Sequence, residues 1–259
     1  MQPRTAGRDG SPSRPRVAEV LLAVFAILAS VPLHAAQPPG LWNQKASDAA
    51  ALDAAWKTQP PALRPAIDFE ILLIRIRAGA PVPEWRDDML KVAQAPAADG
   101  PATAVRELAR AWQARLAVEE IERVALRRHY ANTVRFPEKL DEVRAQIPEP
   151  LRLDPWGEPW VYALHAPQGF GKLTKQRYQL GPARFPNLTP IDRAAKWAAS
   201  PSGLKLAARD GGKALEIRLP DGRSGVVQPG ARVGEVLLVF VGEGWALLAD
   251  TERLFTVVF

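Results

Sequence analysis

The side chains in this 259-residue sequence that could do chemistry are few and scattered. The chain has no cysteine and only three histidines, His34, His129 and His165. Without a thiol, the chain cannot form disulfides, thiolate zinc sites, iron–sulfur clusters or cysteine nucleophiles. With so few histidines, multi-histidine metal sites and serine–histidine catalysis are difficult to assemble. We therefore expect neither a thiol-based nor a histidine-based active site.

The two histidines outside the N-terminal segment have no suitable partners in the sequence. His129 follows two arginines and has no carboxylate or second histidine at a useful spacing, which favours a structural or surface role. His165 precedes the run Gln-Gly-Phe-Gly-Lys at residues 168–172, in which Gly-x-Gly before lysine could suggest phosphate binding. The P-loop spacing and its Ser/Thr are missing, so a plain hairpin loop is favoured.

Carboxylates and serines do not form a catalytic pattern either. The acidic pairs at residues 87–88 and 119–120 are adjacent on predicted helices, so their side chains point in different directions and do not form a hydrolase dyad. Ser202 and Ser224 lack the nucleophile-elbow pattern. The formal net charge of +6 is small and scattered, which does not indicate nucleic-acid binding. We predict no catalytic residue, cofactor or metal ion. An exported hydrolase with an unrecognised site is an alternative.

The first 36 residues are predicted to be an export signal. Four arginines lie within residues 1–16, and an apolar stretch with one glutamate and one serine follows over residues 17–31. A basic start, a short apolar core and a small-residue exit at Ala35 and Ala36 are typical of a secretory signal peptide. The apolar stretch is shorter than the roughly 20 residues that span a bilayer comfortably. We expect a periplasmic or secreted protein. An uncleaved inner-membrane anchor, with the chain facing the periplasm, is the alternative.

Residues 37–101 are predicted to be a helical region with proline-rich linkers. Short helices are expected at residues 47–56 and 84–94. Residues 66–77 are apolar enough for a buried strand, but apolar residues at three- and four-residue spacing favour a helix. A linker rich in proline and glycine follows at residues 95–101.

Residues 102–131 predict one amphipathic helix of roughly eight turns, without a break. Its apolar stripe consists of Leu108, Ala111, Ala114, Val118, Ile121 and Ala125. Glutamates at 119, 120 and 122 lie within pairing distance of arginines at 123, 127 and 128, and a solvated face with weak ion pairs is the favoured interpretation. Phe136 and Pro137 prevent the helix from continuing.

Aromatic residues alternate with proline and glycine turns downstream of this helix. Pro137 predicts a short helix over residues 136–143, and the Asp-Pro-Trp-Gly run at 154–157 predicts a tight turn. We expect the Asp154 carboxylate to cap this turn and the Trp156 indole to pack on the long helix. A strand begins at residue 160 and pairs with residues 177–180. The motif residues, all with predicted structural roles, are Tyr130, Phe136, Pro137, Leu140, Asp154, Pro155, Trp156, Gly157, Trp160, Tyr162, Tyr178 and Gly181.

In this order, the long helix, the Phe-Pro pair, the Asp-Pro-Trp-Gly turn and the Tyr178-x-Leu180-Gly181 strand end resemble the periplasmic half of the major pseudopilin of type II secretion and its type IV pilin relatives. The resemblance covers residues 102–185 and implies a pilin-like fold. The family also has an acidic loop after its last strand that can hold calcium. Residues 181–185 lack those acids, so the calcium site is expected to be absent. The apolar N-terminal segment lies far upstream, which implies a pilin-like head on an exported protein rather than a fibre subunit.

The C-terminal part of the chain predicts a small all-β module. Residues 186–202 are expected to be a linker with a helical turn within 191–199. Half of the 18 glycines lie in residues 201–259, and Asp-Gly pairs between apolar runs are strong hairpin signals. Six short strands in so short a stretch indicate a small barrel or sandwich. The expected strands are 204–208, 214–219, 224–228, 236–241, 245–250 and 254–259.

A second resemblance concerns this β module at residues 203–259. It is similar to the periplasmic homology region of the inner-membrane C component of type II secretion, and to a pilus-assembly lipoprotein that contacts the outer-membrane secretin. The matching residues are 214–219, Asp221-Gly222, Val226-Val227, Gly230, Val233-Gly234 and 245–249.

The expected fold class is α+β. A helical N-terminal region precedes a long helix packed on a small antiparallel sheet, and a small all-β barrel or sandwich follows. The resemblances imply a non-enzymatic exported component or accessory of a type II secretion or type IV pilus-like system. Its expected partners are the secretin, pseudopilins or inner-membrane platform components, without nucleic acid, and with membrane contact only through an uncleaved N-terminal segment. A cell-envelope structural or binding protein with a borrowed pilin-like fold is a further alternative.

Overall fold

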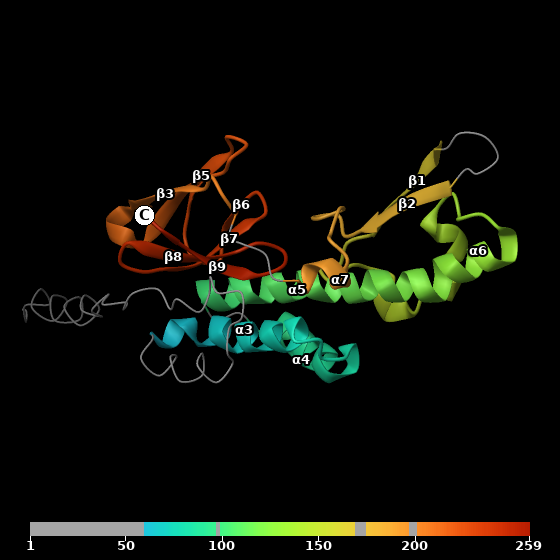
Figure 1. Ribbon diagram of the computed structural model, residues 1–259, viewed down its shortest axis with the longest axis horizontal. Coiled ribbons are helices and arrows are strands. Elements are labelled where there is room, and N and C mark those ends of the chain that lie inside the picture. Colours follow the sequence, from blue (N-terminus) through green and yellow to red (C-terminus); the bar gives the residue numbers. More distant parts are fainter. Residues whose placement is uncertain (1–59, 97–98, 169–174, 197–200) are drawn as a thin grey trace, which may run out of the picture. The chain divides into compact units, whose positions relative to one another are not determined.

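The computed structural model describes residues 60–259 except 97–98, 169–174 and 197–200. This part of the chain is a mixed α+β structure of helices and small antiparallel sheets (Figure 1). The predicted export signal and the expected helix at residues 47–56 lie outside the described residues. Within these ranges, no helix combines the length and the apolar character needed to cross a membrane.

The first described elements are two helices joined by a short turn. A 3-10 turn at Pro61–Leu63 leads into α3, Arg64–Arg77, and α4 follows at Val82–Gln94. The helical interpretation of residues 66–77 is therefore confirmed. The Trp85 indole nitrogen donates to the Ala80 carbonyl, 3.1 Å away, and so fixes the turn between the two helices.

The long helix is present but not uniform. It starts as α5 at Gly100–Ile121, continues through a π-helical turn at Glu122–Leu126 and ends as α6 at Arg127–Thr133. The Asp99 carboxylate caps its N-terminus by accepting from the Ala102 amide at 2.8 Å. The wider π turn was not predicted. Ala125 and Leu126 within it are both fully buried.

A two-stranded antiparallel sheet packs on the second half of the long helix. Strand β1, Val161–Gln168, pairs with β2, Lys175–Gly181, with Tyr162 opposite Leu180. Two 3-10 helices, Leu140–Gln146 and Glu149–Leu151, precede the sheet. A shared core joins them to the helix, as expected for a long helix on a small sheet. It contains Ala114, Ala117, Ile121, Ala125, Leu126, Val143, Ile147 and Trp160, with Tyr162, Tyr178 and Leu180 packed against it.

Two boundaries in this region differ from the sequence prediction. The short helix expected at 136–143 is a 3-10 helix at Leu140–Gln146, because the Glu142 carboxylate accepts from the Lys139 amide at 3.0 Å and so caps it there. Trp160 lies just before β1 rather than in it. Its indole nitrogen donates to the Leu151 carbonyl at 2.8 Å, which ties the residue to the preceding 3-10 turn.

In the described part of the expected linker at residues 186–202 lies a short helix, α7, at Ile191–Ala194, within the predicted helical turn. Seven strands follow it. They are β3 Lys205–Arg209, β4 Ala214–Arg218, β5 Ser224–Val227, β6 Arg232–Val233, β7 Val236–Val241, β8 Trp245–Ala249 and β9 Leu254–Val258. All six expected strands are present within about one residue, and β6 was not expected.

These strands form two separate sheets, so the barrel expectation is wrong. One sheet has the order β3-β4-β5 and the other the order β6-β7-β8-β9, and no sheet in the described residues closes on itself. The two sheets share a core, which corresponds to the sandwich alternative. Its buried residues are Leu215, Ile217, Leu219, Val233, Val236, Leu238, Val241, Ala246, Leu248 and Phe255.

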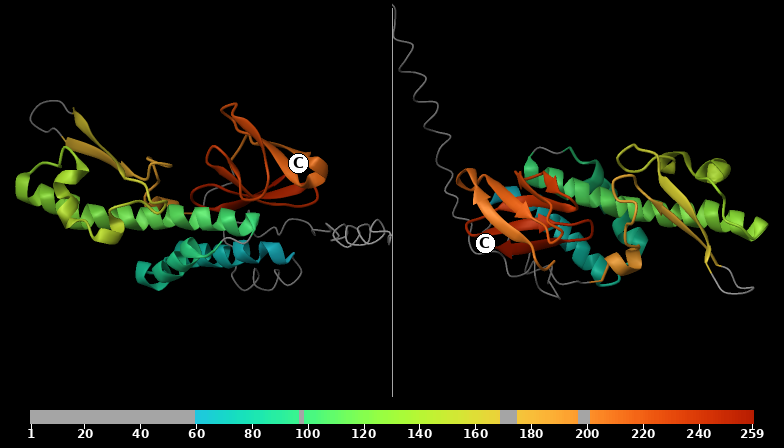
Figure 2. Two further views of the ribbon diagram at one scale, coloured as in Figure 1. Left: turned by 180° about the vertical axis from the view of Figure 1, so that it is seen from behind. Right: turned by 90° about the horizontal axis from the view of Figure 1, so that it is seen from above.

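The larger sheet is covered on its other face by helices. Leu237, Val239, Leu247 and Ala249 belong to a second core that also contains buried residues of α3, α4 and α5. Figure 2 shows α5 alongside both this sheet and the β1–β2 hairpin. Because both faces are covered, β7 and β8 are continuously apolar rather than alternating.

Candidate functional site: a groove beside the long helix

Four aromatic residues of the predicted motif lie next to one another at the end of the long helix. The Phe136 ring lies 4.8 Å from the Tyr130 ring and 4.6 Å from the Tyr178 ring, between ring centres. Tyr178 in turn stacks with Tyr162 at 6.1 Å. The Tyr162 hydroxyl donates to the Pro137 carbonyl at 2.7 Å. These contacts join the helix end, the following loop and both strands of the hairpin. Aromatic pairs of this kind often stabilise contacts between elements.

Asp154 organises the predicted turn. One oxygen of its carboxylate accepts from the Trp156 and Glu158 amides, both at 2.9 Å. The other accepts from the Ala183 amide at 3.3 Å, so this buried carboxylate also holds the segment after β2. Gly157 has φ +85°, a conformation that glycine adopts at little cost.

The Trp156 indole lies against the long helix through a polar contact that the sequence did not reveal. Its nitrogen donates to the Glu107 carboxylate at 2.8 Å, and the same carboxylate forms an ion pair with Arg184 at 3.2 Å. The Arg184 guanidinium also lies over the Trp156 ring at 5.5 Å. This contact joins residues 49 and 77 positions apart in the sequence, so spacing alone could not identify it.

Gly181, the last motif residue, lies where the chain after β2 returns close to the strand. A Cβ added at this position would come within 2.4 Å of the Pro186 carbonyl oxygen, and Gly181 is buried. The motif glycine is therefore required by the close approach of two backbone segments.

We expect Gly181→Ala to lower the free energy of unfolding by about 1–3 kcal/mol, as overpacking against backbone does. Urea denaturation of the full-length chain measures this. Gly157→Ala is the comparison, because nothing lies near its Cβ position and only its positive φ opposes the change. If Gly181→Ala were as stable as the wild type, the close approach to Pro186 would be contradicted.

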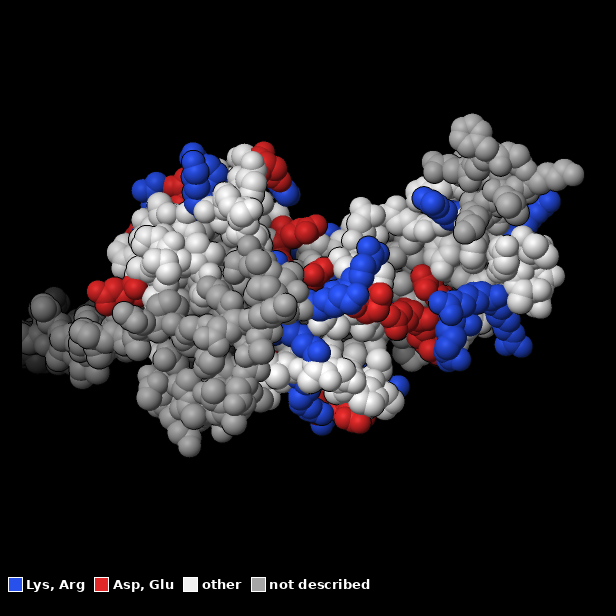
Figure 3. Space-filling model, in the orientation of Figure 1, with Lys and Arg blue, Asp and Glu red and all other residues white. Residues whose placement is uncertain are grey.

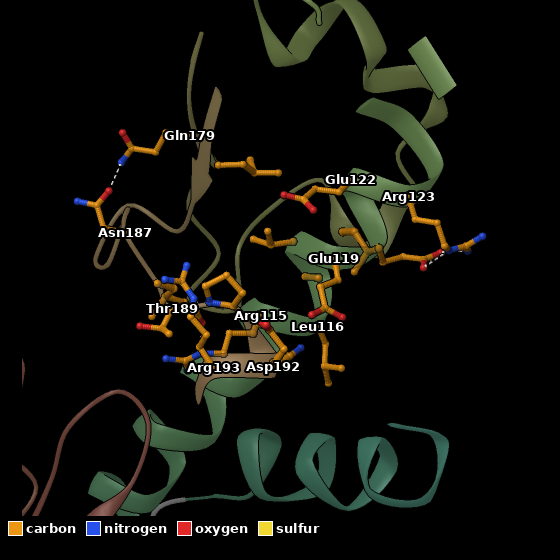
Figure 4. A pocket seen from close by; sticks show the side chains of 18 of the residues that line it. Arg115, Leu116, Glu119, Glu122, Arg123, Gln179, Asn187, Thr189, Asp192 and Arg193 are labelled. Carbon is orange, nitrogen blue, oxygen red and sulfur yellow. Dashed lines mark hydrogen bonds and ion pairs between the residues drawn. The ribbon is translucent and has the colours of Figure 1, made fainter. Parts of the chain in front are cut away.

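Beside this motif, a groove of about 1250 Å³ runs between the long helix and β2. We call it the α5–β2 groove (Figure 4). One wall is formed by α5 and the π turn, from Gln113 to Arg123, and the other by β2. The segment from Pro186 to Arg193 and part of α4 also line it, together with Arg127, Leu151 and His165. Of the motif residues, Tyr178 lines the groove.

Charged side chains of both signs line the groove. The pKa of Glu119 is raised, chiefly by burial and then by the nearby carboxylates of Glu122 and Asp192. Burial, followed by the neighbouring Glu122 carboxylate, raises the pKa of Tyr178 above its usual range. The Glu120 carboxylate forms an ion pair with Arg123 at 2.5 Å, and the hydrogen bond to Arg123 lowers the pKa of Glu120. In Figure 3, basic and acidic side chains lie interleaved over the long helix and α7.

The segment that forms one side of the groove is held by a buried arginine. Arg115 is only 2% exposed. Its Nε donates to the Thr189 carbonyl at 2.8 Å and its Nη1 to the Thr251 carbonyl at 2.7 Å. The guanidinium also lies over the Trp112 ring at 5.2 Å, and burial lowers the pKa of Arg115 to about 10. One side chain of α5 therefore joins the groove wall to the turn between β8 and β9.

The two described histidines lie apart from each other, whereas the carboxylates of Glu119, Glu122 and Asp192 lie near one another in the groove. His165 lies on β1 at the edge of the groove and His129 lies on α6. In the described ranges, no group of three or more histidines, aspartates or glutamates is arranged to hold a metal ion. The groove therefore presents an amphipathic surface that includes a group of neighbouring carboxylates.

Arg115 and the role of residues 186–193 in the groove were not expected from the sequence, in which these residues have the composition of a linker. A signal was available for Arg115: it follows the buried Trp112 by three residues and so lies on the same side of the helix.

Comparisons of the chain with protein-family models, with curated proteins and with solved structures found no match in any of the three.

Proposed function

We propose that the protein is an exported, non-enzymatic component or accessory of a type II secretion or type IV pilus-like system. It acts through protein–protein interaction, in the periplasm or facing it. The α5–β2 groove is the docking surface for another protein of the same system, such as the secretin, a pseudopilin or an inner-membrane platform component.

The observation that carries this proposal is the groove itself. Its walls combine apolar side chains, such as Leu116, Leu180 and Leu188, with charged side chains of both signs. Protein interfaces typically combine an apolar centre with a polar rim and bridging hydrogen bonds. A small-molecule site is usually more enclosed and has a few converging polar groups.

The pilin-like resemblance supports the choice of system. The motif residues lie around the contact between the long helix and the hairpin, where a pilin-like head would need them. The resemblance to secretion proteins rests on the motifs in the sequence.

Site-specific photo-crosslinking in the cell that naturally makes the protein tests the proposal. A photoreactive amino acid is placed at Glu119 or Arg193, on two sides of the groove, and at Glu138, an exposed position outside the groove and the β module, as the matched control. We expect adducts with a secretion-system protein from both groove positions and not from Glu138. If the groove positions gave no adduct containing a secretion-system protein, the proposal would be wrong.

A further inference from the structure

The free edge of β2 faces the α5–β2 groove. Four consecutive residues of this strand, 177–180, all line the groove. Successive side chains of a strand point to opposite faces of the sheet. Four consecutive residues can line one groove only where the groove runs along the strand's edge. Backbone N–H and C=O groups of β2 that do not pair with β1 therefore point into the groove.

No other strand among the described residues lies beside this edge. In the part of the chain that the structure describes, β2 pairs with β1 alone, and no other backbone hydrogen bond joins it to a further segment. The segment that follows reaches β2 through a side chain: the Gln179 amide donates to the Pro186 carbonyl at 3.2 Å and to the Asn187 side-chain oxygen at 2.8 Å. These contacts flank the strand end near Gly181 and leave the edge at Arg177 and Tyr178 open to the groove.

The groove walls are suited to an extended chain with alternating side chains. Opposite β2, the long helix presents the half-buried apolar side chain of Val118. An incoming strand would place every second side chain toward this helix. The remaining side chains would lie on the outer face of the hairpin, where Arg177 and Gln179 are paired with His165 and Ala163 of β1.

Charge indicates which extended chain fits. The only charged side chain that residues 177–180 present is Arg177, which is exposed and forms no ion pair within the described residues. Arg193, on α7, is likewise exposed and outside the described ion pairs. Of the four carboxylates that line the groove, Glu120 pairs with Arg123, whereas those of Glu122 and Asp192 lie near Glu119 and raise its pKa. Six arginines line the groove, so its described lining still carries more positive than negative charge. Acidic side chains on the incoming strand would complement Arg177.

We propose that a partner protein adds an extended, acidic segment to the edge of β2, as an additional antiparallel or parallel strand. This inference rests on the proposed function and specifies how the docking occurs. A second copy of this chain is a less suitable occupant. An antiparallel β2–β2 pair centred on Arg177 would place the Arg177 side chains of both copies opposite each other, and like charges across strands are destabilising.

A peptide-binding experiment on the full-length chain tests the mode of docking. The probe is a fluorescent peptide of alternating glutamate and valine, eight residues long. The first control peptide has the same sequence with alternate backbone amides N-methylated, which keeps the charge and removes strand pairing. The second control alternates lysine and valine. We expect the glutamate peptide to bind about tenfold or more tightly than either control, equivalent to the loss of one or two hydrogen bonds.

Variants and hydrogen exchange locate the binding. Arg177→Glu should weaken binding of the glutamate peptide about tenfold. Lys205→Glu should not, although Lys205 is also an exposed cation on an edge strand, β3. Bound peptide should slow amide exchange in residues 175–181.

Absence of binding, equal binding of the N-methylated peptide or protection elsewhere would overturn strand addition. Self-association that is abolished by Arg177→Glu would assign the edge to a second copy instead and would also overturn it. If strand addition fails while the groove still crosslinks to a secretion-system protein, the proposed function stands and only the docking mode is wrong. If the peptide binds to β2 and no such crosslink forms, β2 accepts an added strand but the proposed role in secretion is wrong.

Discussion

Replacing Arg115 by methionine is expected to destabilise the protein by about 3 kcal/mol, because a buried charged group with good partners is costly to remove. Methionine fills much of the space of the arginine stem but cannot donate to the Thr189 and Thr251 carbonyls. Both acceptors would lose a partner, and the contact of the guanidinium with Trp112 would also be lost. Denaturation in urea of the full-length chain gives the change.

A matched control distinguishes the buried contact from the loss of a positive charge. Arg123→Met makes the same change on the following turns of the long helix, where the Arg123 side chain is 67% exposed and pairs with Glu120. We expect little change in stability there, since exposed ion pairs contribute little. Arg115→Lys should recover only a small part of the loss, because one ammonium group cannot reach both carbonyls. Equal effects at Arg115 and Arg123 would contradict the role assigned to Arg115.

The second large effect is a pH dependence of stability that originates at Glu70 on α3. The residue is 1% exposed. One carboxylate oxygen accepts from Arg77 at 2.5 Å, and the other has no hydrogen-bond partner within the described residues. Burial, opposed in part by Arg77, raises the pKa of Glu70 from 4.5 to about 7. The folded protein therefore holds this proton at pH values where the unfolded chain has released it.

The direction of the effect follows from proton binding. Between pH 4.5 and pH 7 the folded state binds more protons at Glu70 than the unfolded state does. The contribution of Glu70 to the free energy of unfolding must then fall as the pH rises through this range. Between pH 4 and pH 8 the contribution of this group decreases by about 3 kcal/mol, from a shift of about 2.5 pKa units.

Comparison with Glu70→Gln isolates this contribution. Glutamine keeps the shape and an acceptor for Arg77 but does not ionise, so the variant should gain about 3 kcal/mol relative to the wild type between pH 4 and pH 8. Glu138→Gln, at an exposed position, reports the effect of losing one surface carboxylate and is subtracted. Urea denaturation at each pH measures the three proteins. A constant difference between wild type and Glu70→Gln would contradict the raised pKa.

The sequence by itself determined the local elements. Apolar spacing was sufficient for α3 and most of the long helix, because a helix that buries one face must repeat near 3.6 residues. Asp-Gly turns between apolar runs were sufficient for the strands of the β module, because these turns have strict backbone requirements. The Asp154 cap was predictable for the same reason, since an Asp-Pro-x-Gly turn forms its hydrogen bonds within a few residues.

Only the tertiary structure decided how these elements meet. The β7–β8 runs are apolar on both faces, but the sequence does not state that one face covers β4 and the other α5. The sequence also does not show whether the β strands close into a barrel. Closure depends on pairing between distant strand edges, and β9 does not pair with β3. Such pairings depend on contacts far apart in sequence, about which local periodicity carries no information.

The groove shows this division most clearly. Its wall at residues 186–193 has the composition of a linker, and it becomes a wall because Arg115, 74 residues earlier in the chain, binds the Thr189 carbonyl. Its other wall is β2, which was predicted as a strand. The sequence did not predict that one edge of this strand would be left unpaired. The sequence thus predicted the helix or strand to which most residues of the α5–β2 groove belong. Long-range hydrogen bonds and the packing of the hairpin on the long helix bring these residues together.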